Sequence, residues 1–126
     1  MTARWVIHSR AVFTARHALS VYRGQPEASH EHDWEVAIQV GAESLNEEGF
    51  ALDFHEVHAL LESAVAPLRD TDLNRHPTIG SPSPSAERVA EVLAESLGGA
   101  VSAIGGRLLV VSVWEGPENR VDLRLE

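Results

Sequence analysis

Alternating apolar and polar positions predict two long strands in the first third of the chain. Apolar side chains recur at every second position across residues 4–17, interrupted only by Ser9, and His17 continues the same parity. Because successive side chains of a strand point to opposite faces, we expect His17 on the face that carries Phe13 and Ala15. A second strand is predicted from residue 30 to about residue 43, and one of its faces is formed by the even positions His30, His32, Trp34, Val36, Ile38 and Val40.

Two amphipathic segments in the middle of the chain predict helices. The first begins at Asp53, which together with Glu56 fits a capping box. Its apolar residues recur at helical spacing, at Val57, Leu60, Leu61, Ala64, Val65 and Leu68. The second helix is predicted to have Ser83 as its N-cap and Pro84 at its first position, and to stop at Gly98-Gly99. Its apolar face comprises Ala86, Val89, Ala90, Leu93 and Leu97.

Two further strands complete the predicted fold. One carries Leu109, Val111, Val113 and Glu115 on one face, and the last alternates Val121, Leu123 and Leu125 with charged residues. Residues 69–84, between the helices, are rich in Pro, Ser and Asp, which predicts a loop too short to separate two domains. The order ββααββ predicts a single α+β domain over residues 1–126, with a four-stranded antiparallel sheet.

Composition narrows the chemistry that the protein can perform. Cys and Lys are both absent, which excludes disulfides, a cysteine nucleophile, a lysine Schiff base and a P-loop. A net charge of −9 without a basic cluster argues against a nucleic-acid partner. Apolar runs fall short of the ~20 residues of a membrane span, and the N-terminus lacks a signal-peptide stretch, so a cytoplasmic location is expected. A chain of this length buries only a small core, so assembly with further copies is expected.

Three histidines are the strongest candidates for chemistry. His30 and His32 lie two positions apart on one strand, and His17 ends the preceding strand. Three imidazoles can bind a tetrahedral metal ion and leave one position open, as catalytic sites do, whereas structural zinc sites close all four positions. Imidazole suits zinc, copper, iron and nickel, and zinc is the default. The pattern alone leaves open that these are ordinary polar residues.

Three carboxylates are candidates to act beside such a site. Glu115 shares a face with apolar strand residues, where it is either a solvated acid or the acceptor of two parallel N–H bonds from a guanidine-like ligand edge. Glu87 lies in the first turn of the second helix, a favourable position for the helix dipole. Glu27 precedes His30 by three residues and is either a solvated loop acid or a base near the metal.

Six short segments, in the same order, match the patterns of a known family. Three carry the family pattern in full: residues 13–17 (F-x-A-x-H), 49–54 (G-x-x-x-D-F) and 68–74 (L-x-x-x-x-L-N). Three carry it with one change each: residues 30–32 read H-E-H for H-G-H, 84–87 read P-S-A-E for P-T-x-E, and 115–116 read E-G for E-T. Nearly the whole chain therefore resembles the 6-pyruvoyltetrahydropterin synthase and 6-carboxytetrahydropterin synthase family.

The resemblance implies a fold, a metal and a substrate class. The fold is the tunnelling fold, in which two helices cover one face of the sheet and the subunits join as trimers or hexamers into a β-barrel. The metal is zinc, held by His17, His30 and His32. The ligand is a pterin held by Glu115 with help from Glu87, and the family substrate is 7,8-dihydroneopterin triphosphate.

The chain departs from the family at its acid–base residues. The family base is a cysteine before the H-x-H pair, and residues 24–29 contain none. Some relatives carry a glutamate there and cleave the side chain differently, leaving a 6-hydroxymethyl pterin, so Glu27 is the candidate for this role. The family's Asp-His pair falls on Arg69 and Asp70, so Asp70 or Asp72 is the candidate for the second group. These changes indicate a divergent paralogue.

Three functions follow as hypotheses. The favoured one is a zinc-dependent pterin lyase with altered acid–base residues. The alternative is a non-catalytic paralogue that binds zinc and a pterin or purine-like ligand. The third is a zinc hydrolase that acts on another substrate, with hydroxide formed at the open coordination position.

Overall fold

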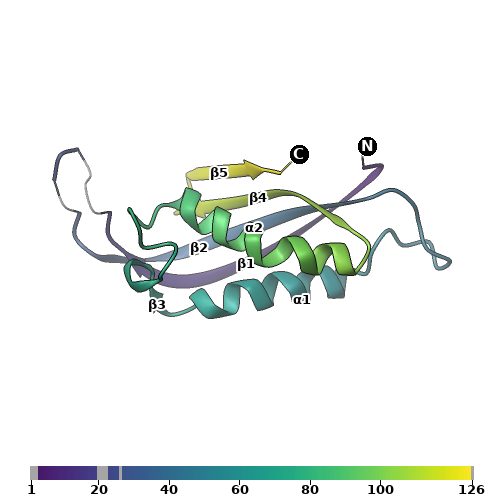
Figure 1. Ribbon diagram of the computed structural model, residues 1–126, viewed down its shortest axis with the longest axis horizontal. Helices are drawn as coiled ribbons and strands as arrows, with labels where there is room; N and C mark the ends of the chain where they lie inside the picture. The colour runs from purple at the N-terminus through teal and green to yellow at the C-terminus, as the bar shows by residue number, and fades with distance from the viewer. Residues whose placement is uncertain (1–2, 20–22, 26, 126) are drawn as a thin grey trace.

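The protein is an α+β domain in which two helices cover one face of a sheet (Figure 1), as the sequence predicts. The computed structural model describes residues 3–19, 23–25 and 27–125. None of the helices in this described part is long and apolar enough to span a membrane. The elements are β1 (Trp5–His17), β2 (His30–Ala42), α1 (Phe54–Val65), β3 (Thr71–Asp72), α2 (Ala86–Ala103), β4 (Arg107–Glu115) and β5 (Asn119–Arg124), with 3₁₀ turns at Ala66–Leu68 and Leu73–Arg75.

The sheet has the strand order β3-β1-β2-β4-β5. The long antiparallel pair of β1 and β2 places His17 opposite His30 at its end. β4 pairs antiparallel with β2, and Glu115 lies opposite Trp34. The last residue of β1 and the first residues of β2 therefore meet the end of β4 at one end of the sheet.

The core lies between the sheet and the two helices. Alternate residues of β1 and β2 are buried, among them Phe13 and Trp34, whose rings stack with their centroids 6.1 Å apart. α1 packs against β1, and α2 packs against β4 and β5. Each helix contributes an i, i+4 stripe to this core; the stripes consist of Val57, Leu61 and Val65 in α1 and of Val89, Leu93, Leu97 and Val101 in α2.

The start of α2 differs from the prediction. Its N-cap is Ser85, whose hydroxyl accepts from the backbone N–H of Arg88, rather than Ser83. Pro84 precedes the helix instead of opening it, and its carbonyl accepts a hydrogen bond from the ring of His17. The first helix is capped by Asp53 as predicted, although its carboxylate accepts from His55, one position earlier than a capping box requires.

The end of α2 was also predicted wrongly, because the helix continues through Gly98 and Gly99 to Ala103. Val101, one turn beyond Leu97, is fully buried and extends the apolar stripe. Burying such a side chain is worth about 1.5–3 kcal/mol, which offsets the cost of about 1 kcal/mol for each helical glycine. The chain leaves the helix at Gly105, which has a φ of 90°.

Residues 69–84, predicted as a loop, contain a short strand and a 3₁₀ turn. Thr71 pairs in parallel with Ala15 of β1, so the sheet has five strands rather than four, and one of its pairings is parallel. Leu73 and Ile79 are fully buried and fix this segment to the core. A bulge opposite Gln39 and Val40 shifts the register of β4, so that Leu108 rather than Leu109 lies opposite Val40.

Candidate metal centre and adjoining pocket

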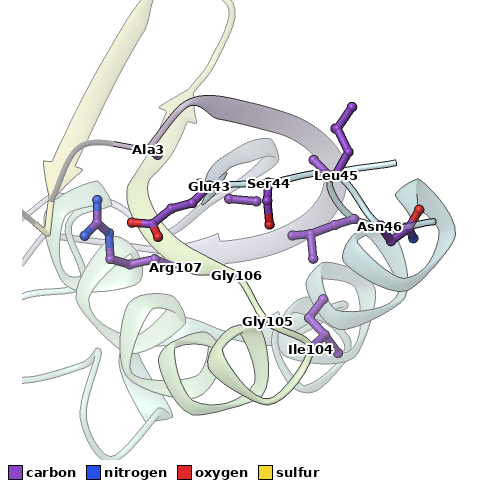
Figure 2. Close-up of a pocket in the computed structure, with 13 residues that line it drawn as sticks. Ala3, Glu43, Ser44, Leu45, Asn46, Ile104, Gly105, Gly106 and Arg107 are labelled. Atoms are coloured by element: carbon purple, nitrogen blue, oxygen red, sulfur yellow. The ribbon is translucent and has the colours of Figure 1, made fainter. Parts of the chain in front are cut away.

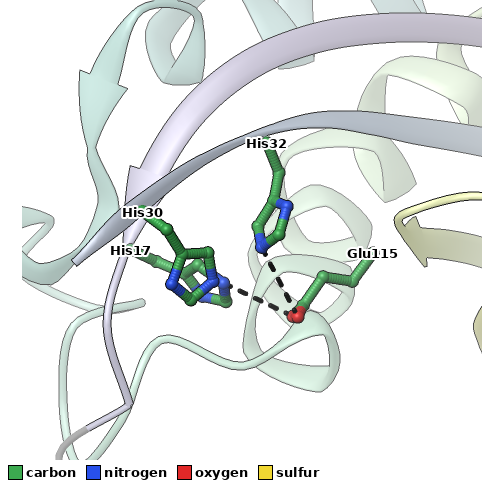
Figure 3. Close-up of side chains that lie close together, drawn as sticks. All are labelled: His17, His30, His32 and Glu115. Atoms are coloured by element: carbon green, nitrogen blue, oxygen red, sulfur yellow. Dashed lines mark ion pairs between the residues drawn. The ribbon is translucent and has the colours of Figure 1, made fainter. Parts of the chain in front are cut away.

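The three histidines converge at the end of the sheet where β1 ends and β2 begins (Figure 3). The ring centroids are 4.6 Å apart for His17 and His30, 5.2 Å for His17 and His32, and 4.2 Å for His30 and His32. The period-two geometry of the strands produces this cluster, because His30 and His32 share a face and His17 pairs with His30.

Backbone contacts fix which nitrogen each ring presents. Nδ1 of His17 lies 2.8 Å from the carbonyl oxygen of Pro84, and Nδ1 of His30 lies 2.9 Å from that of Ala28. A carbonyl oxygen only accepts, so both Nδ1 atoms donate and each neutral ring keeps its lone pair at Nε2. This is the usual outer arrangement of metal-bound histidine, in which the second nitrogen is held by an oxygen.

Two of the three candidate ligand nitrogens are buried and form no hydrogen bond. Nε2 of His17 and Nε2 of His32 are inaccessible to solvent and have no hydrogen-bond partner. An orphaned buried nitrogen of this kind is costly unless a cation completes its environment. The residues therefore fit a metal ion, and His17, His30, His32 and Glu115 form a group with ligand atoms all within 4.8 Å of one another.

Glu115 reaches this group from β4. Its Oε1 lies 3.6 Å from Nε2 of His17, and its Oε2 lies 3.8 Å from Nε2 of His32 (Figure 3). The sequence predicted Glu115 as a ligand anchor, and its position against the histidines was not foreseen. The pairing of Glu115 with Trp34, two residues after His32, is the feature that brings it there.

The pKa of His32 is lowered from its ordinary value. Burial is the main cause, and the neighbouring His30 lowers it further; Glu115 opposes the shift, and His17 adds to it. A lowered pKa favours the neutral imidazole, which is the form that binds metal ions. The site therefore keeps the lone pair of His32 available to lower pH than an isolated histidine would.

A cavity of about 250 Å³ adjoins the candidate metal centre. It brings together Glu115 and Glu87, both predicted from the sequence as ligand-binding residues. Asn119 and Arg120 also line it and were not predicted; they follow Glu115 across a hairpin turn, and Asn119 pairs with Glu115. The guanidinium of Arg120 lies over the ring of Trp114, 5.3 Å from its centroid.

Glu27 lies behind His30. Its Oε1 accepts a hydrogen bond from the backbone N–H of Leu19 and is 4.0 Å from Nδ1 of His30. The carboxylate thus faces the nitrogen of the ring that points away from the other ligands. Its role as a base stays a prediction.

Asp70 lies outside the histidine group within one chain. Its backbone N–H donates to the carbonyl of Thr14, its φ is 59°, and its side chain is exposed. Asp72 caps the following 3₁₀ turn by accepting from the N–H of Asn74. A catalytic role for either residue stays a prediction.

A second cavity, of about 400 Å³, lies at the opposite end of the sheet, around the start of β4 (Figure 2). Its lining includes Glu43, Asn46 and Arg107 and none of the predicted site residues. The predicted metal ligands and the two predicted pocket residues, Glu87 and Glu115, therefore do not line this cavity.

The fold and the site together define an α+β protein with a candidate metal centre beside a ligand-sized pocket. The sequence matches the model of the family described as 6-pyruvoyl tetrahydropterin synthase over residues 6–126, so the chain belongs to that family. The resemblance inferred from the six segments is thereby confirmed. No curated protein matches the sequence.

Solved structures have the same fold. The 6-pyruvoyl tetrahydropterin synthase of Caenorhabditis elegans matches with a TM-score of 0.75 and 17% identity, over 100% of both chains. An uncharacterised protein from Wolinella succinogenes matches with a TM-score of 0.78 and 15% identity, over 97% of this chain and 98% of that one. A Plasmodium vivax 6-pyruvoyltetrahydropterin synthase, in a variant with a catalytic glutamate changed to cysteine, matches with a TM-score of 0.67 and 10% identity, over 97% and 99%. At these identities the likeness shows the fold.

Proposed function

We propose that the protein is a zinc-dependent lyase that acts on the side chain of 7,8-dihydroneopterin triphosphate or a related pterin. The observation that carries the proposal is the pair of buried, unpartnered Nε2 atoms of His17 and His32 beside a cavity that holds Glu87 and Glu115. The metal centre and the cavity share Glu115, and a cavity with two carboxylates beside a metal centre suits a ligand with oxygen atoms at one end and N–H donors at the other.

His17, His30 and His32 would hold the zinc, since three neutral imidazoles are a common catalytic donor set for this ion. When bound, zinc acts as a Lewis acid that polarises the side-chain oxygens of the substrate. The carbonyl groups of Pro84 and Ala28 orient two of the rings and raise their basicity.

Glu115 and Glu87 would recognise the pterin. The pyrimidine edge of a pterin presents adjacent N–H donors, and a carboxylate can accept two of them in parallel. Both side chains line the same cavity, so one can pair with this edge while the other accepts a further donor.

Glu27 is our candidate for the base that replaces the family's cysteine. A catalytic glutamate in the Plasmodium vivax relative supports this role, since it shows that the family can use a carboxylate. Asp70, exposed in the single chain, would join the site from a neighbouring subunit as the second acid–base group. We also propose that the protein assembles as a homo-oligomer, either a trimer or a hexamer. The same proposal includes a cytoplasmic location and describes the protein as a divergent paralogue within the family.

Consumption of 7,8-dihydroneopterin triphosphate by the zinc-loaded protein and its Glu27→Gln variant tests this function. General acid–base catalysis contributes about 100-fold or more, so the rate should fall by at least that factor. Glu31→Gln is the matched control. Glu31 lies between His30 and His32 on β2, but its exposed side chain points to the opposite face of the sheet. A Glu27→Gln variant as fast as the control would remove Glu27 from the mechanism.

A second candidate function is a non-catalytic protein that binds zinc and a pterin or purine-like ligand. It is favoured by the position of Glu27, whose carboxylate already accepts from Leu19 and faces the back of His30. This function predicts saturable pterin binding, measured by the change in pterin fluorescence. It also predicts no loss of the pterin over many hours. Multiple turnovers of any pterin would exclude it.

A further inference from the structure

The carboxylate of Glu115 faces Nε2 of two imidazoles, and neither nitrogen forms a hydrogen bond with it. Nδ1 of His17 donates to Pro84, so Nε2 of that ring carries the lone pair that points at Oε1 of Glu115. Oε2 of the same carboxylate faces Nε2 of His32. Within the described residues, these two histidines are the only ionic partners of Glu115, and its carboxylate makes no hydrogen bond there. An anion facing the lone pair of His17 is repelled unless a cation lies between them, and a cation there would also bring the carboxylate and His32 together.

The separations fit a shared metal ion better than hydrogen bonds. Hydrogen bonds between nitrogen and oxygen span about 2.7–3.2 Å, and the two contacts of Glu115 measure 3.6 and 3.8 Å. Zinc binds nitrogen and oxygen at about 2.0–2.2 Å, which sets the ligand atoms of a tetrahedron about 3.3–3.6 Å apart. Both contacts lie within about 0.3 Å of that range. The Glu115 carboxylate is therefore near the separation of a fourth ligand from two of the three histidines, with one oxygen facing each ring, and all four residues offer ligand atoms within 4.8 Å of one another.

We propose that Glu115 is the fourth ligand of the resting metal centre. The inference rests on the metal site of the proposed function and changes its description, because the position that three histidines leave open is then closed until a ligand arrives. A carboxylate also lowers the charge of the centre from +2 to +1, which suits a site in which His17 is fully buried.

The same carboxylate lines the adjoining cavity, so it lies at the boundary between metal and ligand. N–H donors of a ligand in that cavity compete with the metal for Glu115. When they engage it, the carboxylate leaves the metal and the fourth position opens. Ligand recognition and access to the metal are coupled through one side chain, and an empty pocket keeps the metal shielded.

Metal affinity tests the resting ligand directly, without any measurement of activity. Zinc dissociation constants are measured by competition with a chromophoric chelator for the unmodified protein, for Glu115→Gln and for Glu87→Gln. Removal of a ligand should weaken binding by about tenfold or more, whereas Glu87→Gln, which lines the same cavity outside the histidine group, should bind as the unmodified protein does. Glu115→Asp, with a shorter arm and the same charge, should also bind more weakly. Equal affinities in all four proteins would overturn the proposal.

Release of the carboxylate is tested with cobalt(II) in place of zinc and unsubstituted pterin as the probe. This pterin has no side-chain oxygens to offer the metal, but its ring O4 and N5 can bind one, so the Glu115→Gln variant, measured at pterin saturation, separates binding by the ring from release of the carboxylate. We expect a change in the unmodified protein and none in Glu115→Gln; an unchanged spectrum with pterin bound would refute the release.

Zinc affinity and pterin turnover, measured on the same proteins, separate this inference from the proposed function. Weaker zinc binding by Glu115→Gln in a protein that transforms no pterin would leave the ligand role standing and remove the enzyme. Unchanged zinc binding by Glu115→Gln, in a protein whose unmodified form transforms pterins, would leave the enzyme standing and refute the ligand role of Glu115.

Discussion

Replacing His32 by alanine is expected to abolish the stabilisation of the fold by zinc while leaving the metal-free fold intact. The side chain of His32 is 30% exposed, so its removal opens no sealed cavity. It supplies one of the buried, unpartnered nitrogens, so its loss should weaken zinc binding severely. The variant therefore separates the metal contribution to stability from the packing contribution.

The size of the effect follows from linkage. Zinc at 100 times its dissociation constant stabilises the native state by about 2.7 kcal/mol. An unfolding entropy of about 2.1 cal/mol/K per residue gives about 0.26 kcal/mol/K for 126 residues. Their ratio predicts that this zinc concentration raises Tm by about 10 °C in the unmodified protein.

Thermal unfolding followed by circular dichroism, with zinc and with a chelator, measures this shift. His55→Ala is the matched control, because His55 is exposed on α1 and lies outside the candidate metal group. We expect the shift to persist in His55→Ala and to disappear in His32→Ala. A shift of equal size in His32→Ala would show that zinc stabilises the protein elsewhere and would refute the assignment of the site.

Three further predictions concern the fold that holds the site. Trp34→Ala should lower the free energy of unfolding by about 3–5 kcal/mol in urea titrations, since Trp34 is fully buried and stacks on Phe13. Asp53→Ala should cost about 1 kcal/mol in the same assay, because it removes the N-cap of α1, and Asp53→Asn should restore most of it. The metal-free protein should lose stability as pH falls from about 6.5 through the lowered pKa of His32, since the unfolded chain binds the proton first; His32→Ala should flatten that slope.

The sequence predicts the histidine cluster because strand geometry is periodic. Once residues 4–17 and 30–43 are assigned as neighbouring strands, parity alone puts His30 and His32 on one face and His17 at the adjoining strand end. The family motifs and the two-helix layer follow from equally local patterns, whereas the joint role of Glu87 and Glu115 is implied by the family resemblance, and both residues line one cavity.

Other features depend on contacts between distant segments, and no local pattern reveals them. β3 exists because Thr71 meets Ala15 after both helices have been positioned. The extension of α2 past Gly98 depends on the burial of Val101 against the sheet. Glu115 meets the histidines through the register between β4 and β2, which a bulge at Gln39 shifts. In each case packing between distant segments, and not the local sequence pattern, determines the structure.

The most direct test of the proposed function is the mass of the product formed from 7,8-dihydroneopterin triphosphate by the zinc-loaded protein. We predict a new pterin, whether 6-carboxy, 6-pyruvoyl or 6-hydroxymethyl, that forms over many turnovers and is lost in His32→Ala. Unchanged substrate after incubation with folded, zinc-loaded protein would contradict the assignment as a pterin lyase.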